Sequence, residues 1–251
     1  MFLTLTSLSD SQLYFTLQWP EDKDNLWKKA SVAVEKKTPT HTHEFLGPVT
    51  RLILDVALTE KSEEHLTVRS DREKVIRQEI LTKELAFIQR AIASLLEGKE
   101  GDATVKEDEN LLECYCLKES AAHFRLVWPN LFVAREKGEE LVNRIKLRVA
   151  EKAAESSHEF TAIDITGETY ARGFTRMLGA VPATVGSTPP ASTTTPIPCV
   201  VRLLAIYDAQ GVEATKDGVR KKVVVTSRES VEATCAFNGD LWQPSDWKKS
   251  E

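Results

Sequence analysis

The run Arg51–Glu60, RLILDVALTE, is the feature that most limits what this chain can fold into. From Leu52 to Leu58 every residue is apolar except Asp55, and such a continuous apolar run is typical of a strand that is buried on both faces of a sheet. A carboxylate inside that strand costs free energy unless it is paired, hydrogen-bonded or bound to a ligand. The run therefore predicts a central strand in which Asp55 has a partner.

The remainder of the chain mixes strand-like and helix-like patterns without a regular βαβ alternation. This mixture predicts an α+β fold rather than a doubly wound parallel sheet. A capping box of Ser70 and Glu73 opens the longer of two expected helices. We expect helices over 70–96 and 136–155, and strands in the runs QLYFTLQWP, SVAV, LLECYCL, FRLVWPNLFV, EFTAIDIT, CVVRLLAIYD and KKVVVTSRESVEATCAF.

The composition is that of an ordinary globular chain. Hydrophobic residues make up 41% and charged residues 28% of the 251 residues, and the net charge is −5. That charge provides no general attraction for nucleic acid, so any such contact has to come from a local basic patch. We expect one domain over residues 1–251, in which the Pro-, Thr- and Ser-rich segment 183–198 is a flexible loop.

The cysteines and the N-terminal residues indicate an intracellular protein. The four cysteines include the pair Cys114-x-Cys116 but no C-x₂-C spacing, which favours buried free thiols in a reducing compartment over a zinc site or a disulfide framework. The first residues lack the basic region of a signal peptide, and no apolar run has the length of a membrane span. We therefore expect no membrane partner.

Two strand-like runs each contain a single acid, Asp55 and Asp164. Carboxylates brought together from distant strands can hold Mg²⁺ or Mn²⁺, which prefer oxygen ligands and neutralise substrate phosphates. The alternative interpretation is that each acid caps a neighbouring backbone segment. Ser120 and His123 precede another apolar strand, where the histidine could reach a phosphate or serve a purely structural role.

Taken in order, these stretches resemble the archaeo-eukaryotic primase superfamily, in particular the primase-polymerases of large DNA viruses and eukaryotes. LILDVAL is similar to that family's strand ending in acid-x-acid, and SAAHFRLVWPNLFV is similar to its serine and histidine before an apolar strand. The stretch DITGETYARGFTRMLGAVP resembles its third motif, with Asp164, Tyr170 and Arg176 at matching places. The resemblance covers roughly residues 49–180 and implies a mixed or antiparallel, RRM-like sheet flanked by helices.

The resemblance also implies a role for each matching residue. Asp55 and Asp164 would ligate Mg²⁺ or Mn²⁺, and together with His123 they would form the catalytic set. Ser120, His123 and Arg176 would bind the phosphates of an incoming nucleoside triphosphate. The implied partners are a DNA template and primer, nucleoside triphosphates and a separately encoded helicase, in the nucleus or another compartment where DNA is replicated.

Two positions depart from the family pattern. Ala57 stands where the second carboxylate of acid-x-acid belongs, and Pro182 stands where a lysine is expected. Glu60 lies close to the first motif, but on a straight strand it would point elsewhere. Three hypotheses follow: a DNA primase/polymerase-like nucleotidyltransferase acting in DNA replication with a depleted metal site, a catalytically inactive primase-like subunit that binds nucleic acid or nucleotide, and an unrelated α+β interaction domain.

Overall fold

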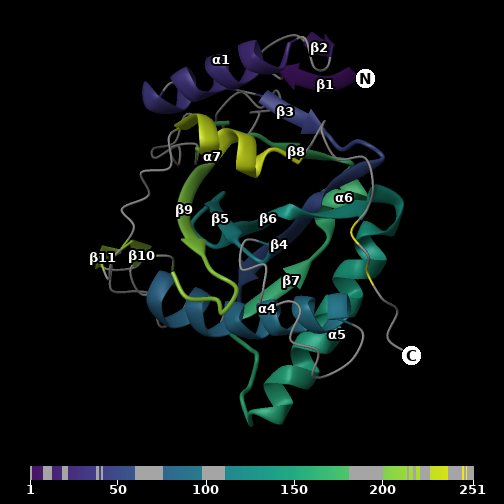
Figure 1. The fold of residues 1–251 in the computed structure, drawn as a ribbon, viewed down its shortest axis with the longest axis vertical. Coiled ribbons are helices and arrows are strands. Elements are labelled where there is room, and N and C mark those ends of the chain that lie inside the picture. The colour runs from purple at the N-terminus through teal and green to yellow at the C-terminus, as the bar shows by residue number, and fades with distance from the viewer. Residues whose placement is uncertain are drawn as a thin grey trace, which may run out of the picture.

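Two antiparallel sheets form the framework of the chain, as the computed structural model shows (Figure 1). The structure describes residues 2–7, 13–18, 22–37, 40, 42–59, 76–97, 111–180, 200–213, 215–216, 219–220, 227–236, 245 and 247. The expected flexible loop 183–198, the capping box of Ser70 and Glu73, Glu60 and Pro182 lie outside these residues.

The larger sheet has five strands in the order β7-β4-β6-β5-β9. All of its neighbouring strands run antiparallel. The α+β prediction is confirmed, as are the buried interior strand at LILDVAL and the strands within LLECYCL and FRLVWPNLFV, which pair antiparallel in the structure. The strands of the five-stranded sheet are β4 (Val49–Leu58), β5 (Cys114–Lys118), β6 (His123–Ala134), β7 (Ile163–Thr166) and β9 (Arg202–Tyr207).

The smaller sheet has four strands in the order β2-β1-β3-β8. It lies above the larger sheet in Figure 1, next to α1 (Lys23–Glu35) and α7 (Ser227–Thr234). A separate two-stranded ribbon pairs β10 (Thr215–Lys216) with β11 (Val219–Arg220). The strands of the four-stranded sheet are β1 (Phe2–Ser7), β2 (Leu13–Gln18), β3 (Thr42–Phe45) and β8 (Phe174–Arg176).

Helices cover one face of the five-stranded sheet. The π-helix η2 (Ile76–Leu81) leads into α4 (Thr82–Glu97), and the 3₁₀ turn η4 (Arg135–Lys137) leads into α5 (Gly138–Glu155). In Figure 1, α4 lies below the sheet and α5 runs from its right-hand side down past α4. The indole N–H of Trp128 on β6 donates to Gln89 of α4 at 2.9 Å, so Trp128 points to this helical face.

The pairing register then assigns the two faces of β4. Leu52 lies opposite Trp128, so Leu52, Leu54, Val56 and Leu58 face the helices and are buried. The alternate residues Ile53, Asp55 and Ala57 face the other way, because successive side chains of a strand point to opposite faces. This second face is the one that matters for the candidate site.

The short helix α6 (Glu168–Arg172) is held against β4 by a tyrosine. The Tyr170 hydroxyl accepts the N–H of Ile53 at 2.9 Å and donates to the Arg51 carbonyl at 3.3 Å, next to a break in the β4–β6 register. Burial raises the pKa of Tyr170. Its ring packs on Gly138, where an added Cβ would lie 2.1 Å from Cδ1 of the tyrosine, so this close approach requires glycine.

The strand expected at SVAV is wrong, and the strand expected over KKVVVTSRESVEATCAF is wrong in its described part, since residues 221–226 and 237 lie outside the described residues. The run SVAV lies in α1, and the stretch 227–234 of KKVVVTSRESVEATCAF is the helix α7. In α1 the fully buried Trp27 and Ser31 are four residues apart, which is helical spacing. In α7 Ser230 and Thr234 are buried with the same spacing.

Candidate functional site

The register of the five-stranded sheet brings three of the predicted site residues to one face. Residues directly opposite one another in neighbouring antiparallel strands project to the same face. Ala57 lies between His123 of β6 and Asp164 of β7, and each is directly opposite it. The residues on this face, which we call the Ala57 face, are Asp55, Ala57, His123, Arg125, Asp164 and Thr166.

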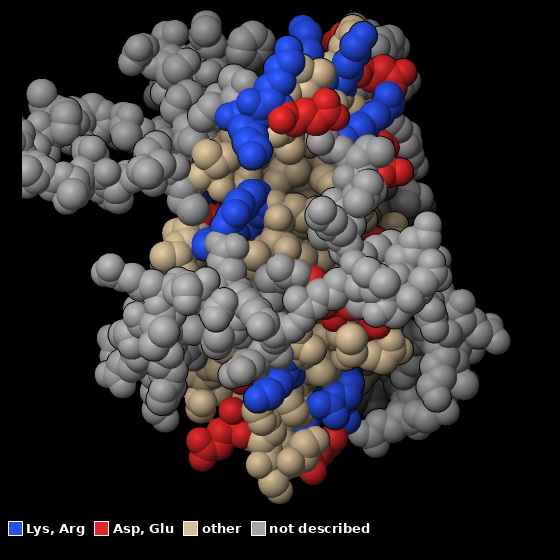
Figure 2. Space-filling view, turned by 90° about the vertical axis from the view of Figure 1, so that its left-hand side faces the viewer, with Lys and Arg blue, Asp and Glu red and all other residues tan. Residues whose placement is uncertain are grey.

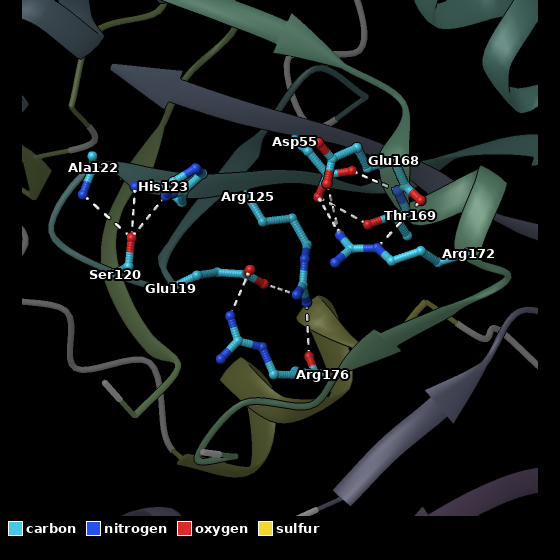
Figure 3. Close-up of polar contacts among 10 residues, drawn as sticks. All are labelled: Asp55, Glu119, Ser120, Ala122, His123, Arg125, Glu168, Thr169, Arg172 and Arg176. Carbon is cyan, nitrogen blue, oxygen red and sulfur yellow. Dashed lines mark hydrogen bonds and ion pairs between the residues drawn. The ribbon is translucent and has the colours of Figure 1, made fainter. Parts of the chain in front are cut away.

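Ser120 fixes the orientation of His123 (Figure 3). The serine oxygen accepts the backbone N–H groups of Ala122 at 3.3 Å and His123 at 3.0 Å, and it lies 2.9 Å from His123 Nδ1. Because the two backbone N–H groups occupy the acceptor side of the serine oxygen, this arrangement favours donation of the hydroxyl hydrogen to Nδ1, which leaves the ring proton on Nε2. The exposed His123 therefore has an N–H donor that can bind an anion.

Asp55 caps the short helix α6. Its Oδ2 accepts the backbone N–H of Thr169 at 2.7 Å, and its Oδ1 accepts the Thr169 hydroxyl at 2.8 Å. Arg172 of the same helix lies 4.0 Å from Oδ1. The structure therefore supports the capping interpretation of this acid, since both carboxylate oxygens are engaged by protein donors (Figure 3).

Asp164 has a cationic partner from the other side of the sheet. Lys146 belongs to α5, and its Nζ lies 2.6 Å from Asp164 Oδ1. Strand β7 is an edge strand, so a long lysine side chain can reach around it from the helical face. Both side chains are half-exposed.

Arg176 does not lie on the Ala57 face but on β8 of the four-stranded sheet. Its guanidinium lies 2.9 Å from Glu119, and the same carboxylate forms an ion pair with Arg125. Arg125 also donates to the Arg176 carbonyl at 2.7 Å. The arginine predicted to bind phosphate is therefore tied into an ion-pair network that joins the two sheets, as Figure 3 shows.

Arg125 is the buried centre of this network. Burial lowers the pKa of Arg125 to about 10, while the negative charge of Asp55 raises it and the charge of Arg176 lowers it. The guanidinium therefore remains charged at neutral pH. Glu119 lies between two arginines, Arg125 and Arg176, and forms an ion pair with each of them.

The described donors do not fit a pair of divalent cations. Among the residues that the structure describes, no three His, Cys, Asp or Glu side chains are grouped to hold a metal ion. A cation at Asp55 would compete with two hydrogen bonds, and one at Asp164 would compete with Lys146. The Ala57 methyl group ligates nothing. The Mg²⁺ or Mn²⁺ site therefore stays a prediction from the sequence, and we derive no catalytic step through it.

The cysteines in the described part of the chain are buried and not paired in disulfides. Cys114, Cys116 and Cys235 are buried thiols outside any disulfide, as expected, and Cys199 lies outside the described residues. Burial raises the pKa of Cys114 well above its ordinary value, so this thiol stays protonated. A protonated buried thiol is a small apolar side chain rather than a metal ligand.

Several residues that contact the predicted site residues were not expected from the sequence. Arg125 could have been found, because it lies two residues after His123 on the same strand and therefore on the same face. Lys146, Thr169 and Arg172 come from helices, and no local pattern relates them to Asp55 or Asp164. Their contacts exist only once the sheet register and the helix positions are known.

The side of the molecule drawn in Figure 2 carries both signs of charge. Lysine and arginine side chains gather near α1 and α7 at the upper end, with acidic side chains between them. Lys28 and Lys29 of α1 and Lys36 directly after it are exposed, but Arg228 of α7 is bonded to Asp24 of α1 at 2.6 Å. Alternating charge of this kind is typical of a solvated surface and is weak support for a nucleic-acid-binding stripe.

Comparison of the chain with known proteins finds no match. No protein family and no curated protein matches the chain. Within the described residues, no helix combines the length and the apolar character that crossing a bilayer requires.

Proposed function

We propose that this chain is a catalytically inactive primase-like protein that binds the phosphate groups of a nucleotide or a nucleic acid at the Ala57 face. One observation carries the proposal: Ala57 lies directly between His123 and Asp164, at the place where the resemblance calls for the second metal-binding carboxylate. A site of this shape keeps the predicted donor His123 and has a methyl group in place of one carboxylate.

The donors around Ala57 support phosphate binding. His123 has an N–H on Nε2, fixed in place by Ser120, and Lys146 supplies an exposed ammonium group on the far side of Ala57. Neighbouring strands are about 5 Å apart, so the backbones of His123 and Asp164, on either side of Ala57, are about 10 Å apart. Charge-assisted hydrogen bonds from such donors are among the stronger contacts that a phosphate makes.

The same arrangement argues against metal-dependent nucleotidyl transfer. Two-metal chemistry needs carboxylates that hold both cations while the attacking and leaving oxygens are aligned. Here Asp55 is used to cap α6 and Asp164 is paired with Lys146. The active enzyme stays the second candidate, because Asp55, His123 and Asp164 do share one face.

A primer-extension assay in Mn²⁺ distinguishes the two candidates. We expect no extension by the wild-type chain, because one carboxylate is replaced by a methyl group. The Ala57→Asp variant tests whether the remaining residues can still support the reaction. Extension by the wild-type chain that disappears in Asp164→Asn would instead establish the enzyme. Asp164→Asn is preferred to a change at Asp55, whose loss would also disturb α6.

Phosphate binding is measured by fluorescence anisotropy with a labelled single-stranded oligonucleotide and by competition with ATP. His123→Ala should weaken binding about tenfold, because one good hydrogen bond to phosphate is lost. His158→Ala is the matched control, since this histidine stacks on Phe87 of α4, away from the Ala57 face. Equal losses in both variants, or no binding by the wild type, would contradict the proposal.

A further inference from the structure

We propose that Lys146 takes the place of a divalent cation at Asp164, so that phosphate groups bind the Ala57 face without any metal ion. The inference rests on the function proposed above, and it specifies how that site holds charge. The described carboxylates around Ala57 are engaged by protein donors and do not form a metal site.

The position of the ammonium group is the first observation. Lys146 Nζ lies 2.6 Å from Asp164 Oδ1, within direct contact of the carboxylate oxygen that a bound cation would use. The lysine arrives from α5, while Asp164 projects from β7 to the Ala57 face. The Lys146 side chain therefore reaches around the sheet edge and brings a positive charge to the carboxylate of Asp164.

The unused capacity of the ammonium group is the second observation. A lysine ammonium has three N–H donors and no acceptor. The contact with Asp164 uses one of them, and 51% of the Lys146 side chain is exposed. Two donors are thus left to bind phosphate oxygens, while the third keeps the side chain in place.

The charge balance of the face is the third observation. Asp55 is engaged by Thr169 and lies near Arg172, and Glu119 lies between Arg125 and Arg176. With Lys146 on Asp164, every acid named here has a protein partner. These partners reduce the repulsion that a phosphate would meet from the three described carboxylates, without a metal ion.

An exposed ion pair of this kind contributes little to folding. The removal of Lys146 should therefore leave a folded chain in which only the charge at the site has changed. Lys152 is the matched control, because it is another lysine of α5 with its own acidic partner, Glu155, at 3.1 Å. Neither Lys152 nor Glu155 lies on the Ala57 face.

The experiment measures oligonucleotide anisotropy at matched ionic strength, once in EDTA and once in Mg²⁺. We expect the wild type to bind in EDTA at least as well as in Mg²⁺. Lys146→Met should weaken binding about fivefold under both conditions, the effect of one exposed charge, and Lys152→Met should leave it unchanged. Binding that requires Mg²⁺, or that is unaffected by Lys146→Met, overturns this inference and leaves the proposed function standing.

A direct metal measurement provides a second readout. Titration of Mn²⁺ followed by electron paramagnetic resonance should give weak binding to the wild type and tighter binding to Lys146→Met, because the lysine no longer competes for Asp164. Unchanged Mn²⁺ affinity in the variant would show that the lysine does not occupy a cation position. An absence of oligonucleotide binding in both EDTA and Mg²⁺ would overturn the inference together with the proposed function.

Discussion

Two threonines close to the site show how much the chemical setting of one hydroxyl group matters. Thr169 and Thr175 are both buried. The Thr169 hydroxyl donates to Asp55 at 2.8 Å, whereas Oγ1 of Thr175 has no hydrogen-bond partner within the described part of the chain. The same substitution at the two positions should therefore have opposite effects.

Thr169→Val should lower the free energy of unfolding by about 1–3 kcal/mol, because it leaves a carboxylate oxygen of Asp55 without its donor. Thr175→Val should be neutral or stabilising, since it replaces an unsatisfied buried hydroxyl with a methyl group of the same shape. Urea denaturation followed by circular dichroism measures both. A similar loss of stability in the two variants would mean that the Asp55 contact is not what stabilises α6.

At the scale of elements, α4 is joined to the chain after α5 by a buried acid. Glu84 is 3% exposed, and its carboxylate lies 3.4 Å from His158, whose ring stacks on Phe87 with 4.6 Å between the ring centroids. Burial raises the pKa of Glu84, while the interaction with His158 lowers it. The raised pKa makes the packing of these two helices sensitive to pH.

The direction in which Glu84 changes the folding stability with pH depends on how many protons the folded and unfolded chains bind. Because the pKa of Glu84 is higher in the folded chain than in the unfolded chain, the folded chain holds more protons than the unfolded chain at pH values between the two, which begin at about 4.3, the ordinary value for glutamate. Stability from this group is therefore present at low pH and is lost as the pH rises through the folded-state pKa. Glutamine at position 84 has no such proton to lose. As the pH rises above about 4.3, the free energy of unfolding of Glu84→Gln, measured by urea denaturation, should therefore increase relative to that of the wild type. Parallel profiles would exclude the effect.

The strands could be predicted from the sequence better than the short helices. The run LILDVAL is apolar on both sides of Asp55 because β4 is an interior strand, and that local signal is sufficient. The run SVAV carries two β-branched residues that favour a strand, but the helical spacing of Trp27 and Ser31 decides its structure. Tertiary packing overrides local propensity where a segment is short.

The candidate site divides in the same way. The sequence indicates Asp55, His123 and Asp164 as residues of interest, and the register places them on one face. The sequence alone does not indicate that Thr169 donates hydrogen bonds to Asp55 or that Lys146 contacts Asp164. Those contacts join side chains from elements that are far apart in the sequence. Whether the site binds phosphate stays a prediction for the assays described above.

At the scale of the whole molecule, one acid links the two sheets. Glu119 follows β5 of the five-stranded sheet and contacts Arg176 on β8 of the four-stranded sheet, while Arg125 lies buried beside both. The loss of one partner from a largely buried ion network leaves uncompensated charge in a setting that cannot solvate it.

Glu119→Gln should therefore lower the free energy of unfolding by about 3 kcal/mol. Hydrogen exchange should also accelerate in β8 and β3, which the network holds against the larger sheet. Glu151→Gln breaks the exposed pair with Arg148 at 2.7 Å and should change stability by less than about 1 kcal/mol. Similar losses in the two variants, with protection unchanged in β8, would show that the sheets are held together without this network.

The pairing of β3 with β8 has a consequence for how the chain is made. Strand β8 is synthesised only after β4, β5, β6 and β7, so β3 emerges from the ribosome long before its partner exists. Until then the nascent β1–β3 ribbon has an open edge, and unpaired edges of this kind favour association between chains. The four-stranded sheet should therefore close late, and slow elongation between β3 and β8 should lower the yield of native protein.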